Sequence, residues 1–270
     1  MSSTSLLTKG LDVQQKPLMV DSQQKNKSSE ILFSLIIPTF NESENITALV
    51  YSLVQTLDFI CANNYELIIV DDDSPDLTWQ VVEDCAKLYP QIKVVRRLYE
   101  RDLSTAVIRG WQIAQGQLLG VIDGDLQHPP DVLFDLLNEI KNGADLAIAS
   151  RHVVGGGANK WCLIRRFLSR GAQLIGLMIL PKVIGKVSDP MSGYFIVRRE
   201  AISNKLLKPV GYKILIEILG RCKIKEIVEV PYVFQERGAG NSKVNSSHYV
   251  NYIHHLIRLR FSRKARLDLI

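Results

Sequence analysis

The sequence predicts an α/β protein built on a mostly parallel sheet with helices on both faces. Short apolar runs alternate with segments of helical periodicity, and the connections between them are short. Acidic and polar residues gather directly after several apolar runs, where open α/β sheets bind ligands. The alternation therefore predicts the fold class, and the strand ends predict the position of a site.

Composition and charge exclude several classes of protein. The 270 residues can bury a sizeable core, and a hydrophobic content of 46% with 23% charged residues is ordinary for a globular protein. The net charge of +5 is modest, and we expect no nucleic-acid partner. The cysteines are far apart and form no CxxC pair, which indicates reduced thiols instead of a zinc site or disulfides.

The chain divides into three segments by composition. Residues 1–30 are polar and lack periodicity, so we expect them to be disordered. Residues 31–245 carry the alternating pattern, and residues 246–270 form a basic tail. No apolar run reaches the roughly 18 residues that a transmembrane helix needs, so we expect membrane contact to be peripheral.

The first half of the alternating region is regular. Residues 31–37 form an almost continuous apolar run, as expected of a buried parallel strand. After a turn at 38–42, apolar residues from Ile46 to Leu57 recur at the spacing of one helical face. By the same criteria, further strands are expected at 65–70, 92–95, 118–122 and 145–150. The helices expected between them cover 78–89, 103–115 and 132–141.

The second half is looser but still alternates. Helices are expected at 165–179 and 211–219, strands at 195–197 and 227–234, and loops at 155–157, 189–194 and 237–243. The glycines at 155–157 suggest a flexible loop, and those in the basic loop at 237–243 suggest a closing lid.

The tail combines apolar and basic residues between Tyr249 and Arg266. Such a helix suits an anionic membrane surface, and a salt-bridged helix packed on its own domain is an equal alternative. We expect His254 and His255 to face lipid headgroups or solvent.

The run at 118–122 ends in two carboxylates one residue apart. Residues i and i+2 of a strand point the same way, so Asp123 and Asp125 aim together, with Gln127 one step further. Converging oxygen ligands suit a hard divalent cation that also carries substrate phosphates. Taken alone, this pair is more often a solvated acidic turn.

Three motifs in order carry a family resemblance. They are Pro-Thr-Phe-Asn-Glu at 38–42, Val-Asp-Asp-Asp-Ser-Pro-Asp at 70–76, and Asp-Gly-Asp-Leu-Gln-His-Pro-Pro at 123–130. Ser150-Arg151, the stretch at 189–195 and the basic loop at 237–243 continue the match. This set resembles the family 2 inverting glycosyltransferases, and more narrowly the polyprenol (dolichol) phosphate mannose synthases, over about residues 31–260.

The resemblance implies a GT-A-type, Rossmann-like nucleotide-sugar fold with Mg²⁺ or Mn²⁺. It implies transfer of mannose from GDP-mannose to a polyprenyl monophosphate with inversion, giving a β-mannosyl phosphate. The donor-binding positions it implies are Pro38, Phe40, Glu42, Val70, Asp72, Asp123, Gly124, Asp125, Gln127, Arg151, Arg237 and Lys243. The implied metal ligands are Asp123, Asp125 and Gln127, the acceptor phosphate would meet Arg165 and Ser169, and the catalytic positions are Asp125 and Arg151.

Elementary chemistry agrees with these roles. Two carboxylates would repel a nucleotide diphosphate unless a cation lay between them. The acceptor phosphate has a second pKa near ~6, so it can attack without a dedicated base, and we assign none. His128, before two prolines, is expected to be structural. Arg165 and Ser169 are four apart on a helix and share one face, which suits a phosphate; without the resemblance, ordinary helix surface is the favoured interpretation of this pair.

The sequence also departs from the family pattern. Asp102 stands where these enzymes commonly have glycine, and we expect it to weaken anion binding or stiffen a loop that needs positive φ. Phe40 replaces the commoner tyrosine and keeps a ring for stacking.

Two other functions stay open at this point. One is transfer of glucose from UDP-glucose, or of another sugar, to the same acceptor. The other is a non-catalytic nucleotide-sugar-binding subunit. Many relatives in this family continue into transmembrane helices, whereas this sequence contains no such run. We therefore expect a peripheral protein at the cytoplasmic membrane face, either with a transmembrane partner subunit or as a truncated gene product.

Overall fold

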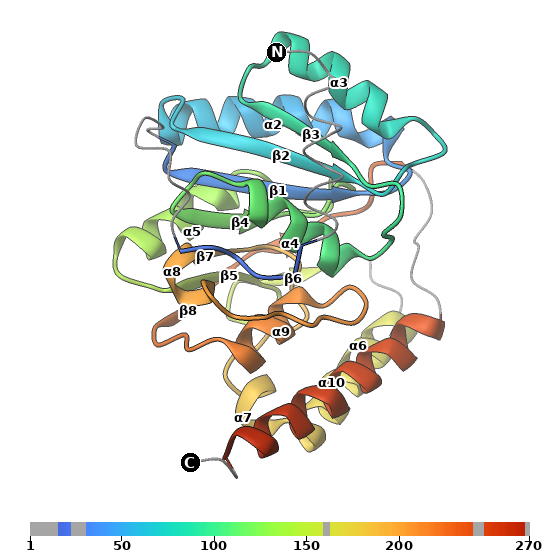
Figure 1. Ribbon diagram of the computed structural model, residues 1–270, viewed down its shortest axis with the longest axis vertical. Helices are drawn as coiled ribbons and strands as arrows, with labels where there is room; N and C mark the ends of the chain where they lie inside the picture. The colour runs from blue at the N-terminus through green and yellow to red at the C-terminus, as the bar shows by residue number, and fades with distance from the viewer. Residues whose placement is uncertain (1–15, 23–30, 159–162, 240–245, 268–270) are drawn as a thin grey trace.

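The computed structural model describes residues 16–22, 31–158, 163–239 and 246–267 (Figure 1). Within them, a seven-stranded sheet forms the centre of the molecule. Its strands, from one edge to the other, are β3 (Ile92–Arg96), β2 (Tyr65–Asp71), β1 (Phe33–Thr39), β4 (Leu118–Val121), β7 (Phe195–Arg198), β5 (Leu146–Ser150) and β8 (Ile227–Pro231).

The sheet is mostly parallel, as predicted, with one reversed strand. β7 runs antiparallel to both β4 and β5, and the other neighbouring pairs are parallel. A separate small sheet pairs β6 (Gly157–Ala158) with β9 (Val233–Phe234). Gly157, expected in a flexible loop, is therefore held in a strand, and the strand expected at 227–234 is split between the two sheets.

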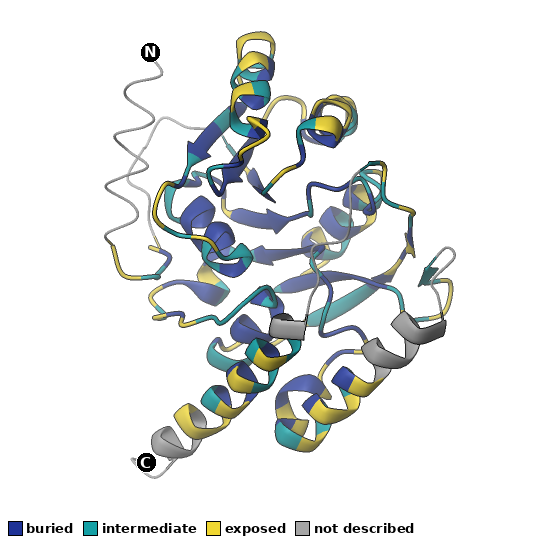
Figure 2. Ribbon diagram, turned by 90° about the vertical axis from the view of Figure 1, so that its right-hand side faces the viewer, coloured by how far each residue is buried: buried dark blue, intermediate teal, exposed yellow. Residues whose placement is uncertain are grey.

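Helices cover both faces of the sheet, and the strands alternate their side chains between the two cores. On one face, Leu35 and Ile37 pack with α2 (Ser43–Cys61), α3 (Thr78–Leu88) and α5 (Val132–Lys141). On the other, Ile36 packs in a core with Trp111 of α4 (Leu103–Ile113) and with α9 (Ile214–Arg221). The shorter helices are α7 (Pro181–Ile184) and α8 (Arg199–Ile202). Figure 2 shows the resulting buried interior.

The prediction of disorder before residue 31 is wrong for residues 16–22. Val20 is fully buried, Met19 forms a β-bridge with Leu206, and Arg109 donates from Nη1 to the Lys16 carbonyl at 2.7 Å. A short apolar segment can become buried by docking on a core that the rest of the chain forms. Such docking leaves no periodic pattern within the segment itself. Residues 1–15 and 23–30 lie outside the described residues.

The tail forms a helix, α10 (Ser246–Leu267), which lies beside α6 (Leu163–Ile179) at one end of the molecule (Figure 1). α10 buries Tyr252, Leu256 and Leu259 in the core. The expectation that His255 faces lipid or solvent is wrong, because it is buried with Nε2 2.7 Å from Glu217 Oε2. In the described part of the chain, no helix is both long and apolar enough to span a bilayer.

Candidate active site

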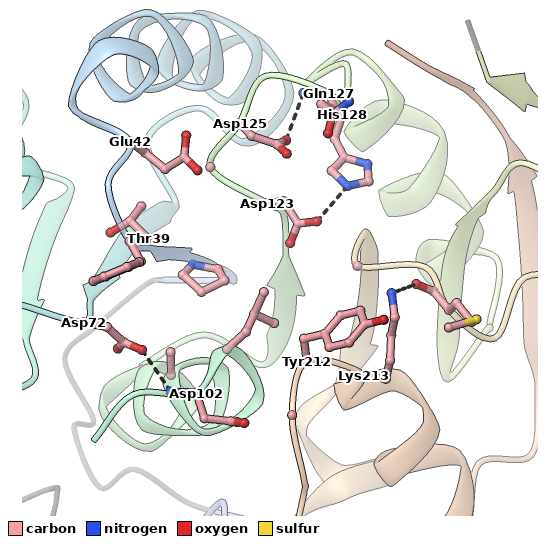
Figure 3. Close-up of a pocket in the computed structure, with 18 of the residues that line it drawn as sticks. Thr39, Glu42, Asp72, Asp102, Asp123, Asp125, Gln127, His128, Tyr212 and Lys213 are labelled. Atoms are coloured by element: carbon pink, nitrogen blue, oxygen red, sulfur yellow. Dashed lines mark hydrogen bonds and ion pairs between the residues drawn. The ribbon is translucent and has the colours of Figure 1, made fainter. Parts of the chain in front are cut away.

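A cavity of about 450 Å³ opens at the carboxyl ends of β1, β2 and β4 (Figure 3). β1 lies between β2 and β4, so the chain connections diverge there and leave a crevice. The predicted donor-binding residues that line this cavity are Pro38, Phe40, Glu42, Asp72, Asp123, Gly124, Asp125, Gln127, Arg151 and Arg237. Fold and motifs therefore converge on one place.

Three predicted residues cannot be placed, and one lies away from the cavity. Val70 is fully buried within β2 and does not line the cavity. Arg165 and Ser169 fall on α6, but their side chains lie outside the described part of the structure. Lys243 also falls outside the described residues.

Asp123 sits at the cavity wall and is held by one of its two oxygens. His128 Nε2 lies 3.2 Å from its Oδ2, whereas Oδ1 is buried with no hydrogen-bond partner among the described residues. Burial alone would raise the pKa of Asp123, but the interaction with His128 and nearby cations, including Lys213, holds it below the usual value. A buried, ionised oxygen without a partner is well suited to a cation. A Cβ on Gly193 would lie 2.9 Å from Asp123 Oδ2, so any larger residue there would displace this carboxylate.

Asp125 accepts two hydrogen bonds that fix its carboxylate. Its Oδ1 accepts from the Gln127 backbone N–H at 3.2 Å, and its Oδ2 accepts from Arg237 Nη2 at 2.8 Å. Leu126 between them has a φ of 63°, which costs a non-glycine residue roughly 1 kcal/mol. Burial, followed by repulsion from Asp123, raises the pKa of Asp125.

His128 lies in an aromatic environment behind the carboxylate pair. It is 2% exposed, and its ring centroid lies 5.2 Å from those of Tyr194 and Phe234 and 5.5 Å from that of Tyr232. These contacts orient the imidazole toward Asp123. They support the structural role expected for His128.

The cavity wall beyond β2 is organised by a buried ion pair. The Asp72 carboxylate accepts from Arg97 Nε at 2.6 Å and from the Asp102 backbone N–H at 3.0 Å. Arg97 is completely buried and was not singled out from the sequence. Burial outweighs the effect of Arg97 and raises the pKa of Asp72 to about 6.

Asp102 serves as the N-cap of α4. Its side chain accepts from the Thr105 backbone N–H at 3.0 Å, which satisfies one of the free donors at the start of a helix. Its φ is −169°, an extended conformation open to any residue, so the expectation of a loop needing positive φ is wrong. Asp102 does line the cavity, and weakened anion binding there stays a prediction.

Two arginines bring positive charge to the cavity. Arg151 makes paired hydrogen bonds of 2.7 Å to the buried carboxylate of Asp189, which fixes its guanidinium beside the Phe234 ring. Arg237 lies 3.1 Å from Glu42 and 2.8 Å from Asp125. Both can present N–H groups to phosphate oxygens.

Several other residues that line the cavity were not predicted from the sequence. Tyr212 and Lys213 form the wall opposite the carboxylates, and Lys213 Nζ donates to the Met191 carbonyl at 2.8 Å. Arg101 lies 5.6 Å from the centroid of the Phe40 ring. Tyr212 had no separate signal in the sequence, where a helix was expected to begin at Gly211. In the structure Gly211 has a φ of 76° and lies in a turn before α9, which begins at Ile214.

Comparisons with known proteins agree with the fold and the motifs. The family model described as Glycosyl transferase family 2 matches residues 34–205. A protein of Pyrococcus furiosus named dolichol-phosphate mannosyltransferase is 45% identical over 226 residues, which are 84% of this chain and 63% of that protein. A protein of the same name from Saccharomyces cerevisiae is 33% identical, with 85% of this chain and 87% of that protein covered. The chain thus spans less than two thirds of the length of the Pyrococcus furiosus protein.

Solved structures share the fold at low sequence identity. A glucosyl-3-phosphoglycerate synthase from Mycobacterium tuberculosis, crystallised with Mn²⁺, UDP and glucosyl-3-phosphoglycerate, matches with a TM-score of 0.63 and 18% identity. The match covers 91% of this chain and 87% of that one. A mannosyl-3-phosphoglycerate synthase from Rubrobacter xylanophilus matches with a TM-score of 0.60 and 16% identity, covering 89% of this chain and 76% of that one. These similarities confirm the expected GT-A-type fold.

Proposed function

The chain belongs to glycosyl transferase family 2, and from that premise we propose that it transfers mannose from GDP-mannose to a polyprenyl monophosphate with inversion. The observation that carries the proposal is the cavity in which the three motifs meet. There the Phe40 ring, the Asp72 carboxylate and the Asp123–Asp125 pair line one space with two arginines. A relative 45% identical to this chain bears the name dolichol-phosphate mannosyltransferase, which supports mannose and a polyprenyl phosphate as substrates.

The donor set at the carboxylate pair fits a divalent cation. Asp123 Oδ1 is buried without a partner among the described residues, and Asp125 lines the same cavity. Within the described ranges, no three His, Cys, Asp or Glu side chains are grouped to hold a metal by themselves. Mg²⁺ commonly binds through one or two carboxylates plus substrate phosphates, so this arrangement matches a cation that arrives with the donor. Asp123 and Asp125 would hold it, with Gln127 beside them.

The chain's own residues can orient the reaction. The Phe40 ring and Asp72 would hold the nucleoside end of the donor, and Asp125 would fix its diphosphate end. Arg151 and Arg237 would offset the repulsion between the donor and the acceptor phosphate. An acceptor phosphate oxygen forms the new bond to the anomeric carbon, and GDP leaves with the electrons of the bond that breaks. Bound Mg²⁺ or Mn²⁺ would stabilise the charge on that diphosphate.

The proposal needs no base from the protein. A monoalkyl phosphate is largely dianionic at neutral pH, because its second pKa is near ~6. It therefore attacks without losing a proton. Asp125 and Arg151 are the residues we assign to catalysis, and Arg165 and Ser169 are the proposed acceptor-phosphate positions.

A donor panel tests the sugar and the nucleotide. GDP-mannose, UDP-glucose and GDP are titrated calorimetrically into the protein with Mn²⁺, and each donor is then supplied with a polyprenyl phosphate. We expect binding and transfer with GDP-mannose. Transfer with UDP-glucose alone would replace mannose in the proposal, and binding without any transfer would favour a non-catalytic subunit.

We further propose that α6 and α10 place the protein on an anionic membrane surface at the cytoplasmic face. Leu174 and Met178 of α6 are 61% and 73% exposed, and Phe261 of α10 is 65% exposed. Arg260 lies next to Phe261 and is also exposed, as expected of a helix at an anionic interface. Replacing Met178 and Phe261 by serine should lower sedimentation with anionic vesicles, and unchanged sedimentation would refute the proposal.

A further inference from the structure

A short strip, residues 235–239, brings Arg237 into the cavity lining and contacts the turn that carries the carboxylates. Gln235 and Gln127 exchange hydrogen bonds, N–H to carbonyl at 2.9 Å and Nε2 to carbonyl at 3.0 Å. A Cβ on Gly238 would lie 2.8 Å from both Asn45 Oδ1 and Leu126 Cδ1, so the strip approaches as closely as it does because this residue is glycine. The strip is thus held against the turn that carries the carboxylates.

The far end of the strip is held by Asn45, in the first turn of α2. Its Nδ2 donates to the Ala239 carbonyl at 3.1 Å, and its Oδ1 accepts from the Ala239 N–H at 2.9 Å. The same Nδ2 also donates to Glu42 Oε2 at 2.8 Å. Asn45 is 2% exposed and makes no cap for its own helix, in a position where asparagine is a poor helix former. Its amide therefore joins α2 to the strip.

Arg237, in the middle of the strip, lies between two acids of the cavity. Its Nη1 is 3.1 Å from Glu42 Oε1, and its Nη2 is 2.8 Å from Asp125 Oδ2. We propose that Asn45 is a positioning residue that holds the strip on α2, so that the Arg237 guanidinium neutralises Glu42 and Asp125 until the donor arrives. This inference rests on the proposed donor site.

The arrangement makes cation and donor binding depend on each other. A divalent cation alone must displace the Arg237 guanidinium from Asp125. A nucleotide diphosphate offers Arg237 new phosphate partners, and so frees Asp125 for the cation. Binding of the one then favours binding of the other, a coupling that works in both directions. Loosening the strip should strengthen binding of the cation alone and weaken binding of the nucleotide with its cation.

The test compares Asn45→Ala and Asn45→Leu with the wild-type protein and with Glu44→Ala, an exposed neighbour in the same helical turn. Asn45→Leu nearly keeps the size and the neutral charge but loses all three hydrogen bonds of the amide. Three readouts are used: the rate of tryptic cleavage after Arg237, the affinity for Mn²⁺ alone by electron paramagnetic resonance, and the affinity for GDP with Mn²⁺. Thermal unfolding checks that each variant is folded, and Asn45→Leu carries the comparison if Asn45→Ala does not fold.

We expect both Asn45 variants to be cleaved about tenfold faster, from the loss of the three hydrogen bonds of the Asn45 amide. They should bind Mn²⁺ alone about threefold to tenfold more tightly and GDP with Mn²⁺ about tenfold more weakly. In an Arg237→Gln background, Asn45→Ala should not change the Mn²⁺ affinity further, because Asn45 acts through Arg237.

Asn45 variants that match Glu44→Ala in cleavage and in Mn²⁺ affinity would overturn the inference. So would a tightening of Mn²⁺ binding that persists in the Arg237→Gln background. Failure of the wild-type protein to bind GDP-mannose would refute the proposed function instead, and the cleavage rates and Mn²⁺ affinities would still decide the role of Asn45.

Discussion

Replacing Arg97 with methionine should destabilise the protein and weaken nucleotide binding together. The guanidinium is fully buried and contacts Asp72 at 2.6 Å, Thr105 Oγ1 at 2.8 Å and the Asp102 carbonyl at 2.9 Å. Removing one member of a buried pair costs about 3–5 kcal/mol, because the other charge is left uncompensated. Arg97 also lowers the pKa of Asp72, which is about 6 with the arginine present, so its loss should protonate Asp72 nearer to neutral pH.

Urea unfolding of the two single variants and the double variant measures this interaction. Asp72→Asn removes the charge that Arg97→Met would strand, so the double variant should be more stable than the sum of the single losses predicts by about 2 kcal/mol. Glu100, which also contacts Arg97 at 3.2 Å, is present in all variants. A loss below about 1 kcal/mol for Arg97→Met, or losses that add within about 0.5 kcal/mol, would refute the reasoning.

The remaining predictions each concern a single residue. GDP affinity should fall as pH drops below about 6, the pKa of Asp72, and calorimetry between pH 5 and 7.5 should show a flatter profile in Asp72→Asn. Burial raises the pKa of Asp72 in the folded protein, so protonation relieves the cost of burying this charge. The Asp72 contribution to the free energy of unfolding should therefore rise as pH falls through about 6, and this pH dependence should be absent in Asp72→Asn. Val20→Ala should lower the free energy of unfolding by about 2 kcal/mol, and no change would show that residues 16–22 do not dock in solution. Gly193→Ala, whose Cβ would lie 2.9 Å from Asp123 Oδ2, should weaken Mn²⁺ binding with GDP about tenfold while leaving thermal unfolding near wild type.

Sequence patterns predicted where most strands lie along the chain, but they did not predict which strands are neighbours in the sheet. The apolar runs located β1, β2, β4 and β5 because a buried parallel strand leaves an almost continuous signature. The antiparallel insertion of β7 between β4 and β5 depends on contacts distant in the sequence, which no local pattern encodes. The docking of Val20 was missed for the same reason.

The sequence located those residues of the candidate site that form a local motif. It did not reveal the residues that hold the site in place through contacts with distant parts of the chain. Asp123 and Asp125 were found because two acids after an apolar run form a local pattern. Arg97 and Asn45 were not, since their partners lie on other elements: Arg97 pairs with Asp72, and Asn45 with Ala239. A buried arginine has the same local sequence signature as an exposed one, so only the folded structure separates them.

The formation of a mannolipid tests the central claim most directly. Purified protein is incubated with GDP-mannose, Mn²⁺ and a polyprenyl phosphate, with Asp125→Asn as the matched variant, and the butanol-extractable product is analysed for its anomeric configuration. The account predicts a β-mannosyl phosphate from the wild-type protein and a loss of at least about a hundredfold in Asp125→Asn. An α-linked product, or equal product from both proteins, would contradict it.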